Sequence, residues 1–303
     1  MTIDSLKAAL DPASIAIVGA SENPNKIGGR PLKFLQTFGY KGAIWPINPA
    51  RNEAQGLPCF TSIEALPEAP DMAIVVVPGD MAVDAIDRLA KRGCKVAGCM
   101  TSGFGETSDP EGKAKQQRMV ATARAAGMRM IGPNCQGVIN FKNGPVASFS
   151  TMLLEETPLD GPIGIVSQSG AMSVVPFGLL RRMGLGVRYT MATGNDADVS
   201  VLEMGAAIAT DPDIRLLLVY IESIPNPEHL VSLARIARAR DLPIVALKSG
   251  RTPAGQKAAQ SHTGALANED RVVDQALADL GIWRAKDVAG LVRAAEGYLE
   301  GWR

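Results

Sequence analysis

The sequence predicts an α/β protein built from two successive domains, each with a parallel sheet. Short β-branched and aliphatic runs alternate with helical patterns along nearly all of the 303 residues, which is typical of βα units. Several runs are almost wholly apolar, as in strands buried on both faces. Residues 143–162 interrupt this rhythm with three prolines and no clear period. We therefore expect one domain over residues 1–145 and a second over residues 146–303.

Five strands and three helices are predicted in the first domain. Glycines 93 and 127 follow two of the helical patterns, where glycine is a favoured C-cap. Pro31 falls near the first turn of the first helix, a position that tolerates proline. We expect strands at 14–18, 43–47, 72–77, 95–100 and 128–131, and helices at about 28–38, 81–92 and 112–126.

The same alternation restarts in the second domain. Gly184 closes its first helical pattern, and polar residues dominate 249–263, which predicts a long loop. We expect strands at 163–167, 187–191, 214–221 and 243–248, and helices at about 170–183, 199–209, 228–240, 268–280 and 286–299.

Composition excludes several classes of protein. The 31 basic and 31 acidic residues balance, so no general attraction to nucleic acid or anionic membranes is expected. No apolar run reaches the ~18 residues of a membrane span, and the start lacks the pattern of a secretory signal. The four cysteines form no CxxC pair, and the two histidines have no metal-ligand spacing. Free thiols, a cytoplasmic location and no metal site are therefore expected.

Small and polar residues follow the predicted strands, where α/β sheets bind ligands. The turn Gly19-Ala20-Ser21 ends the first strand, and we expect its N–H groups to be free to hold a phosphate. It is not a GxGxxG motif, and Asn48-Pro49 stands where a dinucleotide fold carries an acidic residue. Two interpretations stay open: a phosphate-bearing, nucleotide-like ligand, or a purely structural glycine turn. Nearby cations that could add charge are Lys26, Arg30 and Arg51.

A second candidate site lies in the second domain. Ser169, within Ser167-Gln168-Ser169-Gly170, is either an ordinary N-cap or part of an anion site at a helix start. His262 ends the long polar loop, and Glu222 follows an apolar strand. If the two meet, Glu222 can hold one ring N–H of His262 and leave the other nitrogen as a nucleophile. A lone histidine is otherwise usually structural. His229 is predicted to be a surface residue.

Taken together, these motifs resemble the α subunit of succinyl-CoA synthetase and, more closely, the NDP-forming (ADP-forming) acyl-CoA synthetases. The resemblance covers essentially the whole chain, and its strength comes from the order of the motifs. They are Ile131-Gly132-Pro133-Asn134-Cys135 with Gly137, Gly164-Ile165-Val166-Ser167-Gln168-Ser169-Gly170, Gly194-Asn195-Asp196 and Ser261-His262-Thr263-Gly264-Ala265.

The resemblance implies a Rossmann-like CoA-binding domain followed by a flavodoxin-like ligase domain. It also implies that His262 is a phosphohistidine, that Glu222 orients it, and that Ser167, Gln168, Ser169 and Gly170 hold its phosphate. The family's CoA contacts fall on Gly19, Ala20, Ser21, Asn48, Pro49, Val77, Pro78, Thr101, Ser102, Gly103 and Phe104, with Asn134 and Cys135 near the thiol.

Two departures favour the acetyl-type branch over a succinate enzyme. Gln168 replaces the arginine of succinyl-CoA synthetases, and Ser261 replaces the glycine before the histidine. The family also needs an ATP-grasp subunit or fused domain, which would bind ATP or ADP with Mg²⁺. Nothing in this sequence resembles one, so that partner is expected elsewhere, along with a small carboxylic acid or acyl-CoA as substrate and an oligomeric assembly.

The mechanism that the resemblance implies runs through an acyl phosphate. Phosphate attacks the acyl-CoA thioester, His262 takes the phosphoryl group, and the phosphohistidine passes it to ADP on the ATP-grasp module. Two other functions stay open. One is a non-catalytic CoA-binding or regulatory module, and the other is a nicotinamide-dependent dehydrogenase on the same fold.

Overall fold

The computed structural model describes residues 3–252, 255 and 269–299. The chain divides into two compact units. The first comprises Met1–Thr151 with Thr193–Val199, and the second comprises Met152–Ala192 with Ser200–Arg303. The segment Thr193–Val199 therefore belongs to the first unit, although in sequence it lies within the second predicted domain.

The first unit is built on a parallel sheet with the spatial order β2-β1-β5-β6-β7. By chain order this is 2-1-3-4-5, a doubly wound order whose direction reverses between the first and third strands. At such a reversal α/β sheets generally bind ligands beyond the carboxyl ends of the strands, here β1 and β5. The strands are β1 (Ser14–Val18), β2 (Ala43–Ile47), β5 (Met72–Val75), β6 (Val96–Cys99) and β7 (Arg129–Ile131).

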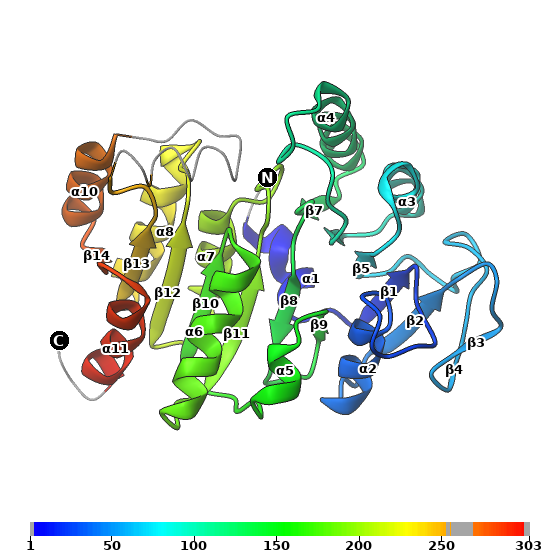
Figure 1. Cartoon of the computed structure of the whole chain (residues 1–303), viewed down its shortest axis with the longest axis horizontal. Coiled ribbons are helices and arrows are strands. Elements are labelled where there is room, and N and C mark those ends of the chain that lie inside the picture. Colours follow the sequence, from blue (N-terminus) through cyan, green and yellow to red (C-terminus); the bar gives the residue numbers. More distant parts are fainter. Residues whose placement is uncertain (1–2, 253–254, 256–268, 300–303) are drawn as a thin grey trace. The chain divides into compact units, whose positions relative to one another are not determined.

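Helices α3 and α4 pack against each other beside this sheet (Figure 1). Ala73 and Val75 of β5 belong to the same buried cluster as Ile86 of α3 and Met119 of α4. Ile74, which points to the opposite face, is also fully buried. The prediction that this strand is covered on both faces is thus confirmed. The helices of the unit are η1 (Ile3–Leu6, a 3₁₀ helix), α1 (Lys7–Leu10), α2 (Arg30–Thr37), α3 (Gly79–Arg92) and α4 (Pro110–Ala125).

Two short hairpins complete the first unit, and neither was predicted. Each pairs its strands in antiparallel fashion. They are β3 (Glu53–Ala54) with β4 (Leu57–Pro58), and β8 (Gly137–Asn140) with β9 (Val146–Ser148).

A buried ion cluster fixes Thr193–Val199 to the first unit. The side chain of Asp198 is 1% exposed, and its carboxylate accepts from Arg129 Nε at 3.0 Å and from the Met130 N–H at 2.8 Å. Arg124 Nε donates to its other oxygen at 2.7 Å. Backbone bonds from Ala197 and Val199 to the β7 region add to this attachment.

The second unit repeats the same strand order. Its sheet runs β14-β13-β12-β10-β11, again 2-1-3-4-5 by chain order, so the flavodoxin-like expectation is confirmed. Helix α7 packs with α8 and α11 with α6. The strands are β10 (Ile163–Ser167), β11 (Val187–Ala192), β12 (Leu216–Ile221), β13 (Ile244–Lys248) and β14 (Trp283–Arg284). The helices are α5 (Met152–Glu155), α6 (Gly170–Arg182), α7 (Val201–Ile208), α8 (Pro227–Ala239), α10 (Asp270–Asp279) and α11 (Val288–Leu299).

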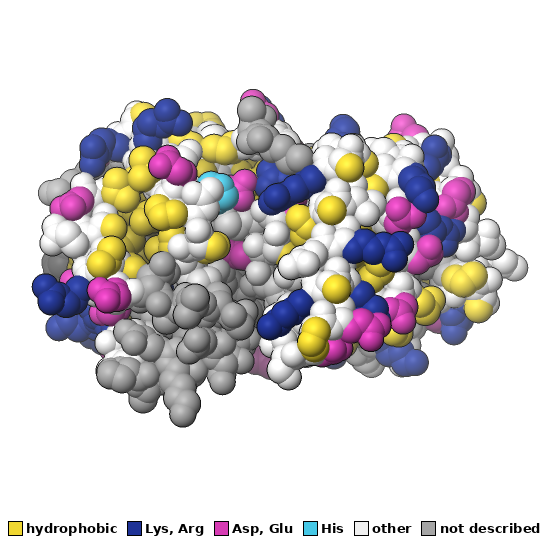
Figure 2. Space-filling view, turned by 90° about the horizontal axis from the view of Figure 1, so that it is seen from above, with side chains coloured by type: hydrophobic (Ala, Val, Ile, Leu, Met, Phe, Trp, Pro, Cys, Tyr) yellow, Lys and Arg dark blue, Asp and Glu magenta, His cyan; other side chains and the backbone are white. Residues whose placement is uncertain are grey.

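Surface features agree with the balanced composition. Basic and acidic side chains are interspersed on the face seen in Figure 2, without a large patch of one sign. Among the described helices, none is long and apolar enough to cross a membrane.

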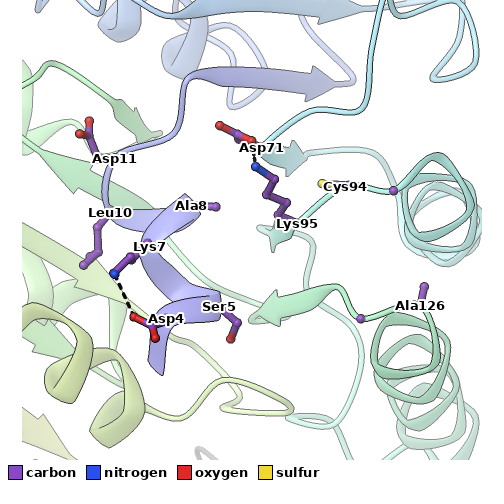
Figure 3. Close-up of a pocket in the computed structure, with 12 residues that line it drawn as sticks. Asp4, Ser5, Lys7, Ala8, Leu10, Asp11, Asp71, Cys94, Lys95 and Ala126 are labelled. Carbon is purple, nitrogen blue, oxygen red and sulfur yellow. Dashed lines mark ion pairs between the residues drawn. The ribbon is translucent and has the colours of Figure 1, made fainter. Parts of the chain in front are cut away.

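A cavity of about 640 Å³ lies in the first unit beside the starts of β5 and β6 (Figure 3). Its two lysines are paired with carboxylates, Lys7 with Asp4 at 2.9 Å and Lys95 with Asp71 at 2.6 Å. The residues that line it include none of those predicted to contact CoA. It lies at the amino end of the strands, whereas α/β sheets bind ligands at the carboxyl end.

Candidate active site

The turn after β1 requires glycine because two strand ends approach closely. Gly19 has a φ of +92°, and a Cβ on it would lie 2.7 Å from Cγ1 of Val77 and 3.0 Å from the carbonyl oxygen of Val76. A side chain would therefore meet both a strained backbone conformation and a steric clash. This contact brings two predicted CoA-binding segments together at the carboxyl ends of β1 and β5.

The amide groups of this turn already have partners. The N–H groups of Gly19 and Ala20 both donate to the carbonyl of Ile47, at 3.1 and 3.2 Å, and that of Ser21 donates to Gly28 at 3.2 Å. The expectation that they are free for a phosphate is wrong, because the turn closes onto the end of β2 and the entry to α2. A ligand would meet this turn through its surface instead.

Asn48 supports the same turn from the end of β2. Its Nδ2 donates to the carbonyl of Ala20 at 2.9 Å, and its Oδ1 accepts from the N–H of Ala50 at 3.0 Å. The neighbouring Pro49 is exposed. Asn48 therefore supports the turn after β1, and Pro49 is the more accessible of the two.

The end of β5 leads into a helix start at the same edge, which has no side-chain cap. Helix α3 begins at Gly79 without a side-chain cap, and Pro78 and Gly79 are exposed. The Thr101 hydroxyl donates to the carbonyl of Val77 at 2.6 Å, which ties the ends of β5 and β6 together. Because first-turn N–H groups have no partner inside their helix, the start of α3 is the part of this edge best suited to an anionic ligand.

Glu106 organises the loop after β6. Its carboxylate accepts from the N–H groups of Gly103 and Phe104 and from Nδ2 of Asn195. Burial alone would raise the pKa of Glu106, but these hydrogen bonds hold the pKa below its ordinary value. Asn195 also donates to Oε1 of Gln116 at 2.9 Å. Neither Glu106 nor Asn195 was predicted as a site residue, although Asn195 lies in a motif noted in the sequence.

Access differs among the predicted residues of this loop. Ser102 and Gly103 are exposed, whereas Phe104 is 1% exposed and packs in the core. The contact predicted for Phe104 is therefore restricted to its backbone, unless the ring leaves the core.

The predicted thiol end of the CoA site combines one exposed and one buried residue. Asn134 is exposed, with a φ of +59°, and its N–H donates to the carbonyl of Thr101 at 2.9 Å. Cys135 is 2% exposed, and burial raises the pKa of its thiol far above its ordinary range. Cys135 therefore stays protonated at neutral pH and is not a candidate nucleophile.

In the second unit, the turn from β10 into α6 forms an ordered N-terminal cap. Ser167 Oγ accepts from the N–H of Ser169 at 3.0 Å and donates to its carbonyl at 2.6 Å. Ser169 Oγ accepts from the N–H of Met172 at 3.5 Å. First-turn N–H groups have no partner inside their own helix, so those of Gly170 and Ala171 are suited to stabilise an anion at this helix start.

The side chain of Gln168 is bonded to the backbone that carries Glu222. Its side chain is buried and turned toward the loop after β12, where Oε1 accepts from the N–H groups of Glu222 and Ser223. Its Nε2 donates to the carbonyl of Ser223 at 3.2 Å. Glu222 itself is 5% exposed. Gln168 is thus brought to Glu222, and the phosphate contact predicted for its side chain remains a prediction.

Of the two histidines, the structure describes only His229. His262 lies outside the described residues, as do its neighbours Ser261 and Thr263. His229, predicted to be a surface residue, is only 31% exposed. Its Nδ1 lies 2.9 Å from the hydroxyl of Ser200, the N-cap of α7, and its Nε2 lies 3.1 Å from Nδ2 of Asn226. His229 therefore links the starts of α7 and α8.

Comparison with known families finds two domains in succession along the chain, and the second match includes Thr193–Val199, which the fold assigns to the first unit. Residues 13–140 match the CoA binding domain family, and residues 160–298 match the family described as succinyl-CoA ligase like flavodoxin domain. The chain belongs to the NDP-forming acyl-CoA synthetase family. Its place there is the region equivalent to the α subunit of succinyl-CoA synthetase.

Individual relatives agree with this family. The chain is 34% identical over 285 residues to the α subunit of acetate–CoA ligase [ADP-forming] I of Pyrococcus furiosus, covering 93% of this chain and 60% of that subunit. It is 34% identical over 276 residues to a trans-feruloyl-CoA synthase of an unknown prokaryotic organism, covering 90% of this chain and 39% of the relative. This chain therefore spans less than two thirds of the length of either relative.

A solved structure has the same fold. The acetyl-coenzyme A synthetase 1 of Ca. Korarchaeum cryptofilum, in complex with phosphate and ADP, superposes with a TM-score of 0.86 at 32% identity. The match covers 94% of this chain and 61% of that one. Both units of this chain thus have counterparts in a solved structure.

Proposed function

We propose that this chain is the α-type part of an acid–thiol ligase, which interconverts acyl-CoA, NDP and phosphate with carboxylic acid, CoA and NTP. The observation that carries the proposal is the buried carboxyl group of Glu222 at the carboxyl end of β12. The neighbouring strand β10, whose Ser167 is in register with Tyr220, leads into the capped start of α6. A hydrogen-bond acceptor for an imidazole and an anion site are thus adjacent.

The reaction proceeds by three displacements. An oxygen of inorganic phosphate attacks the thioester carbon, the C–S bond breaks, and CoA leaves as a thiol after gaining a proton. A ring nitrogen of His262 then attacks phosphorus, the bond from phosphorus to the acyl oxygen breaks, and the carboxylate leaves. Finally a terminal oxygen of NDP takes the phosphoryl group and the P–N bond breaks.

Residues of the second unit support these steps. The carboxylate of Glu222 accepts the second ring N–H of His262, which orients the ring and stabilises the positive charge that develops on it. The N–H groups of Gly170 and Ala171 stabilise charge on the phosphoryl oxygens, since phosphoryl transfer depends mainly on positioning and electrostatics.

The first unit supplies the CoA site in this proposal. The exposed backbone at Pro78, Gly79, Ser102 and Gly103 lines the carboxyl ends of β5 and β6, and a Cβ on Gly103 would meet no atom within 4 Å. This edge therefore has open space for a ligand, and the start of α3 favours a negatively charged one.

The nucleotide would bind to an ATP-grasp subunit or domain, together with Mg²⁺. The P. furiosus relative is named an α subunit, which supports a partner for this chain as well. We also place the protein in the cytoplasm and in an oligomer. The four cysteines are free thiols, as in a reducing compartment.

The histidine step is tested with acetyl phosphate labelled with ³²P, in the presence of CoA. We expect label that is stable to alkali and lost in acid, the behaviour of a phosphohistidine. The sequence has only two histidines, so His262→Ala should abolish labelling and His229→Gln serves as the matched control. Labelling that persists in His262→Ala, or no labelling with intact CoA binding, would contradict the proposal and favour a non-catalytic CoA-binding module.

The choice of cofactor is tested by calorimetry on the full chain. We expect CoA to bind and NAD to show no heat of binding. The replacement Gly103→Ala sits in open space but at a φ of +100°, so it should distort the loop and weaken CoA binding. Binding of NAD in preference to CoA would support a dehydrogenase instead.

A further inference from the structure

Side chains satisfy three consecutive backbone N–H groups in the loop that follows β6. The carboxylate of Glu106 accepts from Gly103 and Phe104. Oε1 of Gln116, which lies on α4, accepts from Gly105 at 3.1 Å. These N–H groups lie outside any helix or strand, so no regular backbone pairing fixes them. The path of the loop backbone therefore depends on the two side chains.

Asn195 connects the two acceptors. Its Nδ2 donates to Oε2 of Glu106 and, at 2.9 Å, to Oε1 of Gln116. A side-chain amide nitrogen carries two hydrogen atoms, so both are used. Asn195 comes from Thr193–Val199, the segment that belongs to the first unit although it lies between β11 and α7 in the sequence. A residue 89 positions away from Glu106 thus completes the support of this loop.

The backbone of Asn195 is held by the turn after β7. Its N–H donates to the carbonyl of Pro133 at 3.0 Å. The preceding Gly194 has a φ of +62°, and a Cβ on it would lie 2.4 Å from the carbonyl oxygen of Pro133 and 2.5 Å from that of Asn134. Only glycine permits this close approach. Asn195 therefore reaches Glu106 from a fixed position.

The supported loop leaves its outer surface open. Gly103 donates its N–H to Glu106 and is nevertheless exposed, and a Cβ on it would meet no atom within 4 Å. Ser102 is exposed as well. The hydrogen bonds that hold Gly103 at a φ of +100° thus do not cover the surface that is predicted to contact CoA.

We propose that Glu106 and Asn195 are positioning residues for CoA, which hold the backbone of Ser102 and Gly103 in the conformation that the ligand requires. The inference rests on the proposed function, in which this loop contacts CoA. Neither side chain needs to touch CoA itself. When the pair is broken, the loop populates other conformations, and CoA affinity falls by the fraction of molecules that are no longer competent to bind.

The variant Asn195→Leu tests the inference without changing the net charge. Leucine is similar in size to asparagine but donates no hydrogen bond. We expect the dissociation constant for CoA, measured by calorimetry on the full chain, to rise about tenfold, the effect of losing one hydrogen bond to a charged group. The number of binding sites should stay the same. A merely structural loss would lower that number instead, because unfolded molecules do not bind.

The matched control is Asn143→Leu. Nδ2 of Asn143 also donates to a carboxylate of the first unit, Oδ1 of Asp11 at 2.9 Å, in a bond that does not involve the loop after β6. This variant should bind CoA with unchanged affinity. An equal loss of affinity in both variants would show a general effect and would overturn the inference.

Exchanging the polarity of the pair separates positioning from charge. Glu106→Gln turns an N–H donor toward Nδ2 of Asn195, so it should weaken CoA binding. Adding Asn195→Asp restores an acceptor for the new amide group but places a negative charge near an anionic ligand. Positioning therefore predicts a gain in CoA affinity over Glu106→Gln, and simple repulsion predicts a further loss. The gain should be partial, because the new carboxylate also faces Oε1 of Gln116.

The outcomes distinguish this inference from the proposed function. If Gly103→Ala weakens CoA binding while Asn195→Leu and Glu106→Gln bind CoA with unchanged affinity, the inference is wrong and the proposed function stands. The absence of a gain when Asn195→Asp is added to Glu106→Gln would also overturn the inference. If the unaltered chain does not bind CoA, the proposed CoA site is wrong, and the inference is wrong with it.

Discussion

Replacing Asp198 by alanine should destabilise the first unit strongly. The carboxylate is 1% exposed and lies against the equally buried Arg129, whose side chain is 3% exposed. Removing one partner of such a pair leaves a buried charge without compensation, at a cost of about 3–5 kcal/mol. Arg124 adds little, because its side chain is 53% exposed and exposed pairs contribute only about 0–1 kcal/mol.

Trp45 provides a local measurement of this effect. It is buried in the first unit, and the other two tryptophans, Trp283 and Trp302, can be replaced by phenylalanine. In that background, urea unfolding followed by Trp45 fluorescence should shift its midpoint downward by about 2 M, taking a slope of about 2 kcal/mol/M. Trp45 fluorescence reports the unfolding of the first unit alone. This matters because a chain with two units need not unfold in a single step.

The matched control is Glu64→Ala in the same unit. Glu64 pairs with Arg88 through two oxygens, but its side chain is 59% exposed, so we expect less than about 1 kcal/mol. An Asp198→Ala midpoint no lower than that of Glu64→Ala would refute the argument from burial. Asp198→Asn should fall between the two, because it keeps one acceptor and loses the charge.

Three further predictions concern local chemistry. Gly19→Ala should lower both thermal stability and CoA affinity, since its Cβ would clash with Val77; an unchanged melting temperature would contradict this. At pH 8 a thiol reagent should reach only Cys59, because burial raises the pKa of Cys94 and Cys99 to about 12 and about 11 and that of Cys135 still further; rapid reaction of all four thiols without denaturant would be the contrary result. Asn195→Ala should make the free energy of unfolding depend less steeply on pH in the acid range. The folded pKa of Glu106 is depressed below 4.5, so its contribution is complete above that pH and is lost as pH falls through the folded pKa; urea midpoints below and above pH 4.5 measure this.

The five-residue strands β1, β2 and β10 were predictable from the sequence, whereas most of the very short strands were not; β7, with three residues, was predicted at 128–131. The bounds of β1, β2 and β10 agree with the predictions, because each is a continuous apolar run between turn residues. The strands β3, β4, β9 and β14 have two or three residues each. Such lengths cannot show a period of two, and their pairing depends on partners that the local sequence does not reveal.

The candidate site was predictable in its location but less so in its contacts. Ser169 and Glu222 follow the paired parallel strands β10 and β12, which end at the same edge of the sheet, and their roles in the site stay predictions. The direction of the Gln168 side chain depends on a loop 54 residues away, which spacing alone cannot show. The prediction of free N–H groups at Gly19 and Ala20 was wrong for the same reason. Both groups donate to the carbonyl of Ile47, which lies on another strand.

The return of Thr193–Val199 to the first unit matters to anyone who wishes to produce the units separately. A fragment that stops at Thr151 retains Arg129 but discards Asp198, and it leaves Glu106 without Asn195. The fragment would be less stable because of where it is truncated, and not because its sheet is intrinsically unstable. The seven missing residues, Thr193–Val199, could be joined to such a fragment through a glycine-rich linker. Recovery of solubility would show how much this segment contributes to the stability of the first unit.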